Sequence, residues 1–378
     1  MWYNLYIRNQ YRIGVEKMNI AEFAAGIKKP VPVVSGEEYC IAASGLDHGH
    51  IGGMVSGLHD AGARLLYVYD SVKSRAEAMA QRYGAKVVDS MEEIYADRRV
   101  KMVCSAAIPA RRGPLGCEVM RHGMDFFADK APFTTLEQLA EAKRTEKETG
   151  QRYFVYYSER LHNESAIMAG YFIREGVIGK VVNIIGTGPH RISLPTREPW
   201  FFTRKDYGGI LTDIGSHQAE QFLFYTGSDE AKVVSSAVGN FKFTEYPELD
   251  DFGEMLLESS TGASGYHRVD WYTPDGLGSW GDGRCFIEGS EGFIELRKNI
   301  DITVSKRPNR LLLVNGEGEF SFDCTGATGF PFFGEIILDS LEKTEHAMTS
   351  HHIFKAAELA LTAQKNAVER TGRDRIYL

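Results

Sequence analysis

The 378-residue sequence is poor in cysteine and contains no long apolar run. No apolar stretch is long enough to cross a bilayer, and residues 1–10 lack the apolar core of a signal peptide. The five cysteines form no C-x-x-C pair, which argues against a disulfide framework and structural zinc; they are Cys40, Cys104, Cys117, Cys285 and Cys324. These absences predict a cytoplasmic protein without a membrane partner or a metal.

Positive charge is also in deficit. The chain has 43 Lys and Arg against 51 Asp and Glu, which gives a formal net charge of −8. Proteins that bind nucleic acid or anionic membranes usually carry the opposite excess, so we expect neither partner. The apolar share of 43% and the charged share of 25% are those of a soluble globular protein.

The length predicts two domains, at ~100–200 residues per domain. We expect an N-terminal extension over residues 1–37, with a short helix over 20–27, and Met18 is an alternative start. A first domain over 38–156 and a second over 157–378 follow.

The first domain opens with the pattern of a dinucleotide-binding unit. A buried strand over 39–44 leads into a glycine-rich turn over 45–52, then an apolar helical pattern, then a strand that ends in Asp70. The turn departs from G-x-G-x-x-G, because Asp47 and His50 replace the second and third glycines. The alternative is another βαβ unit in which Asp70 merely caps the next helix.

Asp70 favours NAD, because an acid at this place accepts hydrogen bonds from the ribose hydroxyls. Arg75 follows closely and can accommodate a 2′-phosphate, so NADP remains open. The expected cofactor-binding residues are Gly45, Asp47, His48, His50, Ile51, Asp70, Ser71, Arg75, Ala107, Pro109 and Lys130.

Strand and helix patterns then alternate to residue 157, which predicts a doubly wound parallel sheet. Lys130 lies just past the strand over 124–128, at the carboxyl edge where such sheets bind ligands. A lysine there can donate to a substrate hydroxyl and favour its alkoxide-like form. The alternative is a solvated loop lysine.

Asp213 and His217 lie four residues apart in a helical pattern that follows Gly208 and Gly209. That spacing places both side chains on one face of a helix, one turn apart. A carboxylate beside an imidazole can handle protons near neutral pH. The alternative is a surface pair on an ordinary helix.

The second domain offers aromatic and basic side chains that suit a sugar, although aromatic residues are more often part of a core. A glycine-rich loop over 271–284 contacts either substrate or a neighbouring subunit. A final amphipathic helix is expected over 351–370, capped near Thr349 or Ser350. The expected substrate-binding residues are Arg160, His190, Arg191, Trp200, Asp213, His217, Trp271 and Trp280, with an interdomain salt bridge as the alternative role for Arg160.

The chain resembles the Gfo/Idh/MocA family, which includes glucose–fructose oxidoreductase and inositol dehydrogenase. The resemblance rests on the turn over 45–52, the segment over 129–132, the segment over 208–217 and the run over 286–296. It implies an N-terminal Rossmann domain and a C-terminal α/β domain built on a large open, mostly antiparallel sheet.

The family's Glu-Lys-Pro lysine lies near the nicotinamide and matches Lys130, and its later Asp and His match Asp213 and His217 as substrate-binding and proton-transferring groups. Two departures are Asp129 in place of Glu and Ala131 inserted before Pro132.

The function predicted on this basis is reversible hydride transfer between NAD(P) and a secondary alcohol of a sugar, polyol or glycoside. His217 would take the hydroxyl proton, Lys130 would stabilise the oxyanion, and Asp213 would orient His217 or bind a neighbouring hydroxyl; Lys130 as the main base stays open. The alternatives are an NAD-dependent glycosidase or lyase with transient sugar oxidation, at C3 for example, and a non-catalytic nucleotide-binding partner protein. A broad open sheet has a face to cover, so we expect a homo-oligomer, a dimer or tetramer.

Overall fold

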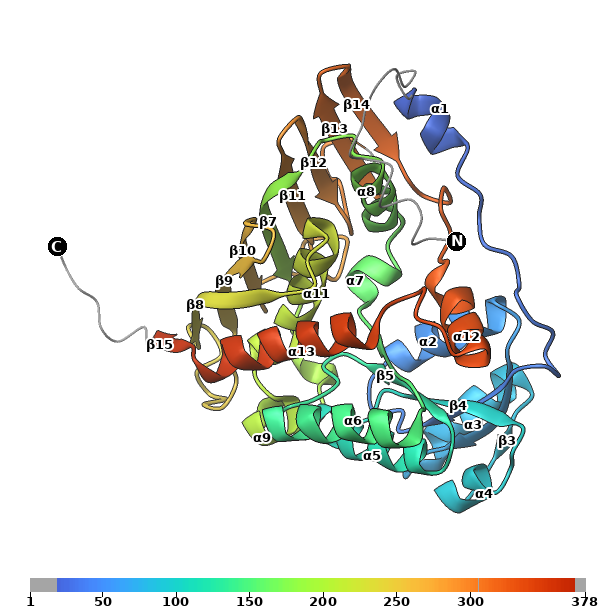
Figure 1. The fold of residues 1–378 in the computed structure, drawn as a ribbon. Coiled ribbons are helices and arrows are strands. Elements are labelled where there is room, and N and C mark those ends of the chain that lie inside the picture. Colours follow the sequence, from blue (N-terminus) through green and yellow to red (C-terminus); the bar gives the residue numbers. More distant parts are fainter. Residues whose placement is uncertain (1–18, 305, 371–378) are drawn as a thin grey trace.

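The computed structural model describes residues 19–304 and 306–370, and the expectations for residues 1–18, including a start at Met18, lie outside this part. The described part contains two separate β-sheets, one parallel and one mostly antiparallel, as Figure 1 shows. The short expected helix is present as α1 (Ile20–Ala25). No helix of the described part is long and apolar enough to cross a membrane.

The first sheet is parallel throughout and has the order β3-β2-β1-β4-β5-β6. Its strands are β1 (Cys40–Ser44), β2 (Arg64–Tyr69), β3 (Lys86–Val87), β4 (Val100–Ser105), β5 (Asp125–Asp129) and β6 (Tyr153–Tyr156). The connecting helices are α2 (His50–Asp60), α3 (Lys73–Tyr83), α4 (Met91–Tyr95), α5 (Pro109–Arg121) and α6 (Leu136–Thr149). The strand order reverses between β1 and β4, and ligands bind in the crevice at such a switch point. The predicted Rossmann-type domain is therefore confirmed.

Every residue of β1 and β5 is buried, as expected for parallel strands covered by helices on both faces. Gly45 directly follows β1 and has a positive φ of 66°, and a Cβ there would lie 2.7 Å from the Cβ of Ala107. The turn after β1 therefore packs directly on the turn after β4, and only glycine fits between them.

The second sheet is mostly antiparallel and has the order β14-β13-β12-β11-β7-β10-β9-β8-β15. Only the pairs β7–β10 and β8–β15 are parallel. The bounds are β7 (Val181–Pro189), β8 (Ala231–Gly239), β9 (Phe252–Ser259), β10 (Ser264–Asp270), β11 (Arg284–Gly289), β12 (Gly292–Arg297), β13 (Arg310–Asn315), β14 (Gly318–Asp323) and β15 (Val368–Arg370). The predicted large open sheet is confirmed.

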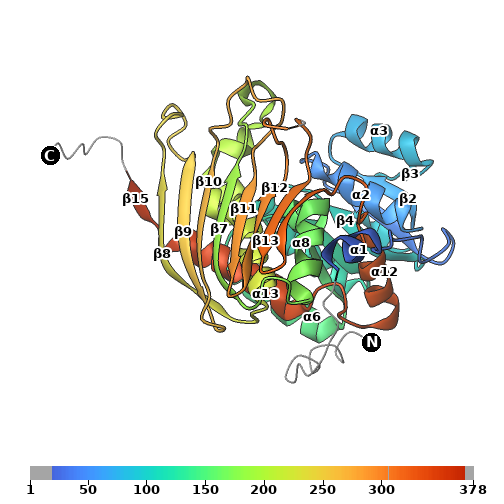
Figure 2. The same cartoon turned by 90° about the horizontal axis from the view of Figure 1, so that it is seen from above.

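Helices cover one face of this second sheet, and no described element covers the other (Figure 2). They are α7 (Ser158–Leu161), α8 (Glu164–Arg174), α10 (Ile210–Asp213), α11 (Gly215–Thr226) and α13 (Ser350–Lys365). Short turns of helix, η2 (Leu194–Thr196), η3 (Pro199–Phe202) and α9 (Arg204–Tyr207), lie in the connection between β7 and α10.

Two late helices bind the domains together. α12 (Phe332–Glu342) packs on α2, and α13 packs on α6 and β6 of the first domain, as Figure 1 shows. We therefore propose to keep the predicted boundary near residue 157, with α12 and α13 as the segments that return to the first domain.

Two local expectations were wrong. The final helix ends at Lys365, because residues 368–370 pair with the free edge of β8. Asp213 and His217 do not share one helix, because α10 ends at Asp213 and α11 begins at Gly215. α5 begins at Pro109, a residue type that is favoured at a first helical position. The predicted cap is confirmed, since the Thr349 hydroxyl accepts the His352 N–H at 3.1 Å.

The contact between α2 and α12 yields a test of the packing. A Cβ on Gly57 would lie 2.4 Å from the ring of Phe333, whereas a Cβ on Gly52 of the same helix meets nothing within 4 Å. We expect Gly57→Ala to be less stable than Gly52→Ala, with a free energy of unfolding in urea that is about 1–3 kcal/mol lower. Adding Phe333→Leu to Gly57→Ala should recover part of the loss. Equal stability of the two glycine variants would contradict this contact.

Candidate functional site

The candidate site is a cavity between the two domains, at the carboxyl edge of the parallel sheet. It is lined by His48, His50, Pro109, Arg112, Lys130, His190, Arg197, Trp200, Phe201, Asp213 and Trp271. Its volume is about 40 Å³, which is room for a few water molecules. A sugar can enter only if side chains or domains move apart.

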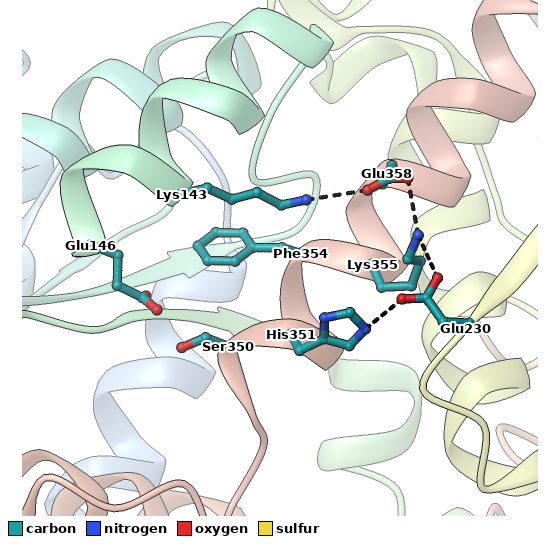
Figure 3. A pocket seen from close by; sticks show the side chains of 8 residues that line it. All are labelled: Lys143, Glu146, Glu230, Ser350, His351, Phe354, Lys355 and Glu358. Carbon is teal, nitrogen blue, oxygen red and sulfur yellow. Dashed lines mark hydrogen bonds and ion pairs between the residues drawn. The ribbon is translucent and has the colours of Figure 1, made fainter. Parts of the chain in front are cut away.

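A larger hollow of about 480 Å³ lies between α6 and α13 (Figure 3). Its charged side chains pair with one another: Lys143 Nζ lies 3.2 Å from Glu358, and Lys355 Nζ lies 2.9 Å from Glu230. None of the predicted site residues lines it. The chemistry therefore points to the smaller cavity.

An ion pair between Lys130 and Asp213 joins the two domains inside this cavity. Lys130 directly follows β5, Asp213 ends α10, and Nζ lies 2.7 Å from Oδ1. Both side chains are buried. Burial favours the neutral acid, but the charge and hydrogen bond of Lys130 outweigh it and hold the pKa of Asp213 below its ordinary value. The two predicted segments thus meet as a charged pair.

His217 lies close enough to Lys130 for their charges to interact, but it does not line the cavity. Its side chain is buried, and its Nδ1 has no hydrogen-bond partner in the described part of the chain. Burial lowers the pKa of His217 to about 3, although the Glu159 carboxylate acts in the opposite direction. The imidazole is therefore neutral at physiological pH, and the same burial makes it a weaker base than a solvated histidine.

No hydrogen bond between described side chains joins Asp213 to His217. The expected orientation of His217 by Asp213 is therefore absent, because the Asp213 carboxylate is engaged by Lys130. The carboxylate that interacts with His217 and His190 belongs to Glu159 instead. Its Oε2 accepts from Lys298 Nζ at 2.6 Å, and its Oε1 lies 4.0 Å from His190 Nε2.

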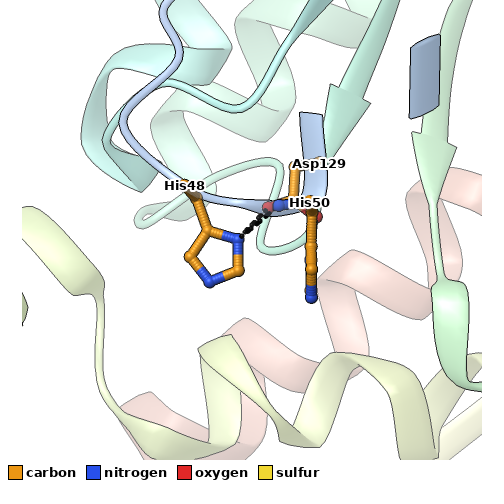
Figure 4. Close-up of side chains that lie close together, drawn as sticks. All are labelled: His48, His50 and Asp129. Atoms are coloured by element: carbon orange, nitrogen blue, oxygen red, sulfur yellow. Dashed lines mark hydrogen bonds and ion pairs between the residues drawn. The ribbon is translucent and has the colours of Figure 1, made fainter. Parts of the chain in front are cut away.

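His48 and His50 bring two further imidazoles into the cavity. Figure 4 shows both rings beside the Asp129 carboxylate, with Nδ1 distances of 3.2 Å from His48 and 2.9 Å from His50. Arg112 Nη2 lies 3.2 Å from the same carboxylate. Burial favours the neutral acid here too, but the charges of His50 and Arg112 hold the pKa of Asp129 well below its ordinary value.

The residues at the glycine turn fit a dinucleotide. α2 begins after Gly49 without a side-chain cap, and a Cβ at Gly49 would meet nothing within 4 Å, so the start of the helix is open. Asp70 follows β2 beside the turn, where its Oδ2 accepts the Leu46 N–H at 2.5 Å. A dinucleotide would be held by the turn after Gly45, the start of α2 and Asp70.

Arg75 modifies this half of the site. Its guanidinium lies 2.8 Å from Asp47 Oδ1, 4.0 Å from Asp70 Oδ1 and 2.9 Å from Glu198 of the second domain. A cation beside Asp70 is what a 2′-phosphate needs. The remaining expected residues differ in surroundings: Pro109 lines the cavity, Ile51 is buried in the core, Ala107 packs on Gly45, and Ser71 is exposed.

Of the expected substrate residues, four line the cavity: His190, Trp200, Asp213 and Trp271. Four others do not: His217, described above, and Arg160, Arg191 and Trp280. Arg160 is paired with Glu220, as in the salt-bridge alternative, although this pair joins α7 to α11. Arg191 donates to the carbonyls of Pro274 and Leu277 and so holds the 271–284 loop, and Trp280 is exposed with its ring 4.5 Å from His190.

Three cavity residues were missed. Arg112 lies three residues after Pro109, at the same carboxyl edge that singled out Lys130, so that argument could have found it. Arg197 lies between η2 and η3, and its guanidinium is 4.2 Å from the ring centre of Phe201. Phe201 lies in η3 next to Trp200, so the aromatic signal that singled out Trp200 could have found it.

The comparisons with known proteins agree with this geometry. The model described as "Oxidoreductase family, NAD-binding Rossmann fold" matches residues 49–157, and the GFO/IDH/MocA C-terminal domain matches residues 169–295. No curated protein matches.

Among solved structures, a candidate oxidoreductase from Erwinia carotovora atroseptica SCRI1043 is 42% identical, with a TM-score of 0.85 over 88% of this chain and 99% of that one. The WlbA dehydrogenase from Bordetella pertussis, solved with NADH and UDP-GlcNAcA, is 17% identical with a TM-score of 0.69 over 88% of this chain and 96% of that one. KijD10, a 3-ketoreductase from Actinomadura kijaniata, is 14% identical with a TM-score of 0.69 over 88% and 99%.

The matches of low identity show the fold alone, whereas the 42% identical oxidoreductase aligns with this chain over nearly its whole length. Together with the two domain models, it shows that this protein, with its NAD-binding Rossmann domain, belongs to the Gfo/Idh/MocA family of oxidoreductases.

Proposed function

We propose that the protein transfers a hydride between a bound NAD or NADP and a secondary alcohol of a sugar, polyol or glycoside. The observation that carries the proposal is the buried Lys130–Asp213 pair at the carboxyl edge of an NAD-binding domain. A dehydrogenase needs a cation where the substrate oxygen gains negative charge, and Lys130 supplies one from a buried position. The five free cysteines, all buried, agree with the cytoplasmic location we propose.

Each residue then has one task. Asp213 holds the Lys130 ammonium in place and balances its charge. Lys130 donates to the substrate oxygen and favours its alkoxide form, and neutral His217 accepts the hydroxyl proton once the cavity opens. The bound nicotinamide supplies the hydride acceptor or donor.

The lining of the cavity favours a polyhydroxylated substrate. Trp200, Phe201 and Trp271 offer apolar ring faces for C–H groups, and His190 and Arg197 offer hydrogen bonds for hydroxyls. This mixture of a few aromatic faces with convergent polar groups is what recognition of a sugar ring requires.

Kinetics of single variants test the assignment. We expect Lys130→Met and His217→Asn each to lower kcat/KM by about 10²- to 10⁴-fold, the range typical for a lost proton-transfer group. Lys143→Met, an exposed lysine on α6, is the matched control and should behave as wild type.

A sugar and glycoside panel with the purified protein separates the two enzymatic alternatives. Net reduction of the cofactor supports the dehydrogenase, and release of an aglycone without net reduction supports the lyase. Wild-type turnover in both Lys130→Met and His217→Asn would refute the assigned roles.

The pH dependence of kcat/KM follows from the buried imidazole. The pKa of His217 is lowered to about 3, so the base stays unprotonated as the pH falls well below the ordinary histidine range. We expect kcat/KM to be flat between about pH 8 and about pH 5, while circular dichroism confirms folding. An acid limb centred at about 6.5 would show a solvated histidine and contradict this reading.

We also propose self-association through the uncovered face of the second sheet. Leu256, Tyr266, Ile185 and Phe286 form a continuous row across β9, β10, β7 and β11. Ile185 is 45% exposed and Tyr266 39%. Such an apolar row on an uncovered face is typical of a subunit contact.

Light scattering after size-exclusion chromatography tests this contact. We expect a dimer or tetramer for the wild type and monomer for Ile185→Glu, because the new charge would be buried in the interface. Leu341→Glu, at a comparably exposed leucine on α12, is the control and should keep the wild-type mass. A monomeric wild type would end the proposal.

A further inference from the structure

The cluster of His48, His50 and Asp129 has no task in the proposed hydride transfer. One potential ligand atom from each side chain, a ring nitrogen of each histidine and a carboxylate oxygen, lies within 4.8 Å of the other two. Around a tetrahedral ion with bonds of about 2.0–2.2 Å, neighbouring ligand atoms lie roughly 3.3–3.6 Å apart. The observed 3.2 Å between His48 Nδ1 and Asp129 Oδ2 needs little adjustment to reach that spacing.

The carboxylate is not satisfied by hydrogen bonds alone. Asp129 is fully buried, yet its Oδ2 accepts no hydrogen bond from the described residues. His48 Nδ1 and Arg112 Nη2 both lie 3.2 Å away, as ion-pair contacts. A buried carboxylate oxygen of this kind has a place for a further positive partner.

The cluster is closed on one side and open on the other. Asp129, at the end of β5, is the fully buried member of the cluster. The side chains of His48 and His50 are 23% and 33% exposed, and they line the cavity together with Lys130. Three protein ligands with an open position toward the substrate is the arrangement of catalytic rather than structural metal sites.

Arg112 contributes to the net charge around the cluster, which decides what kind of ligand a bound metal ion would take. Its Nε donates to the Ala107 carbonyl at 2.6 Å and its Nη1 to the Ala131 carbonyl at 3.1 Å, so the guanidinium remains anchored without Asp129. Arg112, Asp129, Lys130 and Asp213 together are formally neutral, and a divalent ion adds two positive charges. Its open position should therefore take an anionic oxygen, such as hydroxide or a carboxylate.

We propose that His48, His50 and Asp129 bind one divalent transition-metal ion of the Zn²⁺ class, with an open position facing the cavity. The earlier expectation of no metal rested on cysteine spacing, which says nothing about a site assembled from a turn and a strand end 79 residues further along the chain.

Titration of the chelator-treated, dialysed protein with Zn²⁺ and Co²⁺ tests this site without any dinucleotide. We expect one ion per chain by calorimetry, visible d–d absorption of bound Co²⁺, and a higher melting temperature with Zn²⁺. His48→Ala and His50→Ala should each weaken binding by more than about 100-fold, beyond the usual cost of a lost outer-shell partner. His59→Ala is the matched control, because His59 lies on the same helix with its Nδ1 3.8 Å from Asp60.

Both histidines are partly exposed, so their variants should keep the wild-type circular dichroism spectrum without metal. Absence of a bound ion in the wild type, or an ion retained in both His48→Ala and His50→Ala, would overturn the proposal. Either result leaves the kinetic test of Lys130 and His217 standing, because the titration does not depend on turnover.

Discussion

The ion pair between Lys130 and Asp213 is the contact on which the arrangement of the site depends. Its two halves come from separate domains, so it exists only while the end of β5 faces the end of α10. Removing one member would leave a buried charge without its partner, at a cost of roughly 3–5 kcal/mol. The returning helices α12 and α13 pack on the first domain and so keep the two halves opposite each other.

The same pairing recurs around the cavity and decides where protons can move. Asp129 faces Arg112, Glu159 faces Lys298, and Glu220 faces Arg160. Each of these carboxylates has its own cation, so none is a ready base. Burial at the same time lowers the pKa values of His48 and His190 to about 4 and that of His217 to about 3. These imidazoles are therefore uncharged at neutral pH, and they are uncharged nitrogen bases near the cavity.

Sequence patterns could predict the fold because both sheets depend on local signals. The apolar strands of the first domain alternate with helices capped by residues such as Thr135, and the second domain shows period-two strands. The patterns could not predict where some helices and strands begin and end, because tertiary contacts decide those positions. β15 pairs with the free edge of β8, and α10 and α11 are separated at Ile214.

The sequence could predict those site residues whose position follows from the topology of the parallel sheet. Lys130 and Pro109 were found because strand ends meet at one edge, and Arg112 obeys the same rule. Asp213 was found from its helical spacing to His217 and from the family resemblance. Arg160 and Arg191 were misplaced because a sequence does not reveal that Glu220 or a loop carbonyl will capture a guanidinium first. His48 and His50 were assigned to the cofactor turn by position, whereas their partner Asp129 comes from β5. A long-range partner of this kind can turn a loop residue into a ligand, and only the assembled fold reveals it.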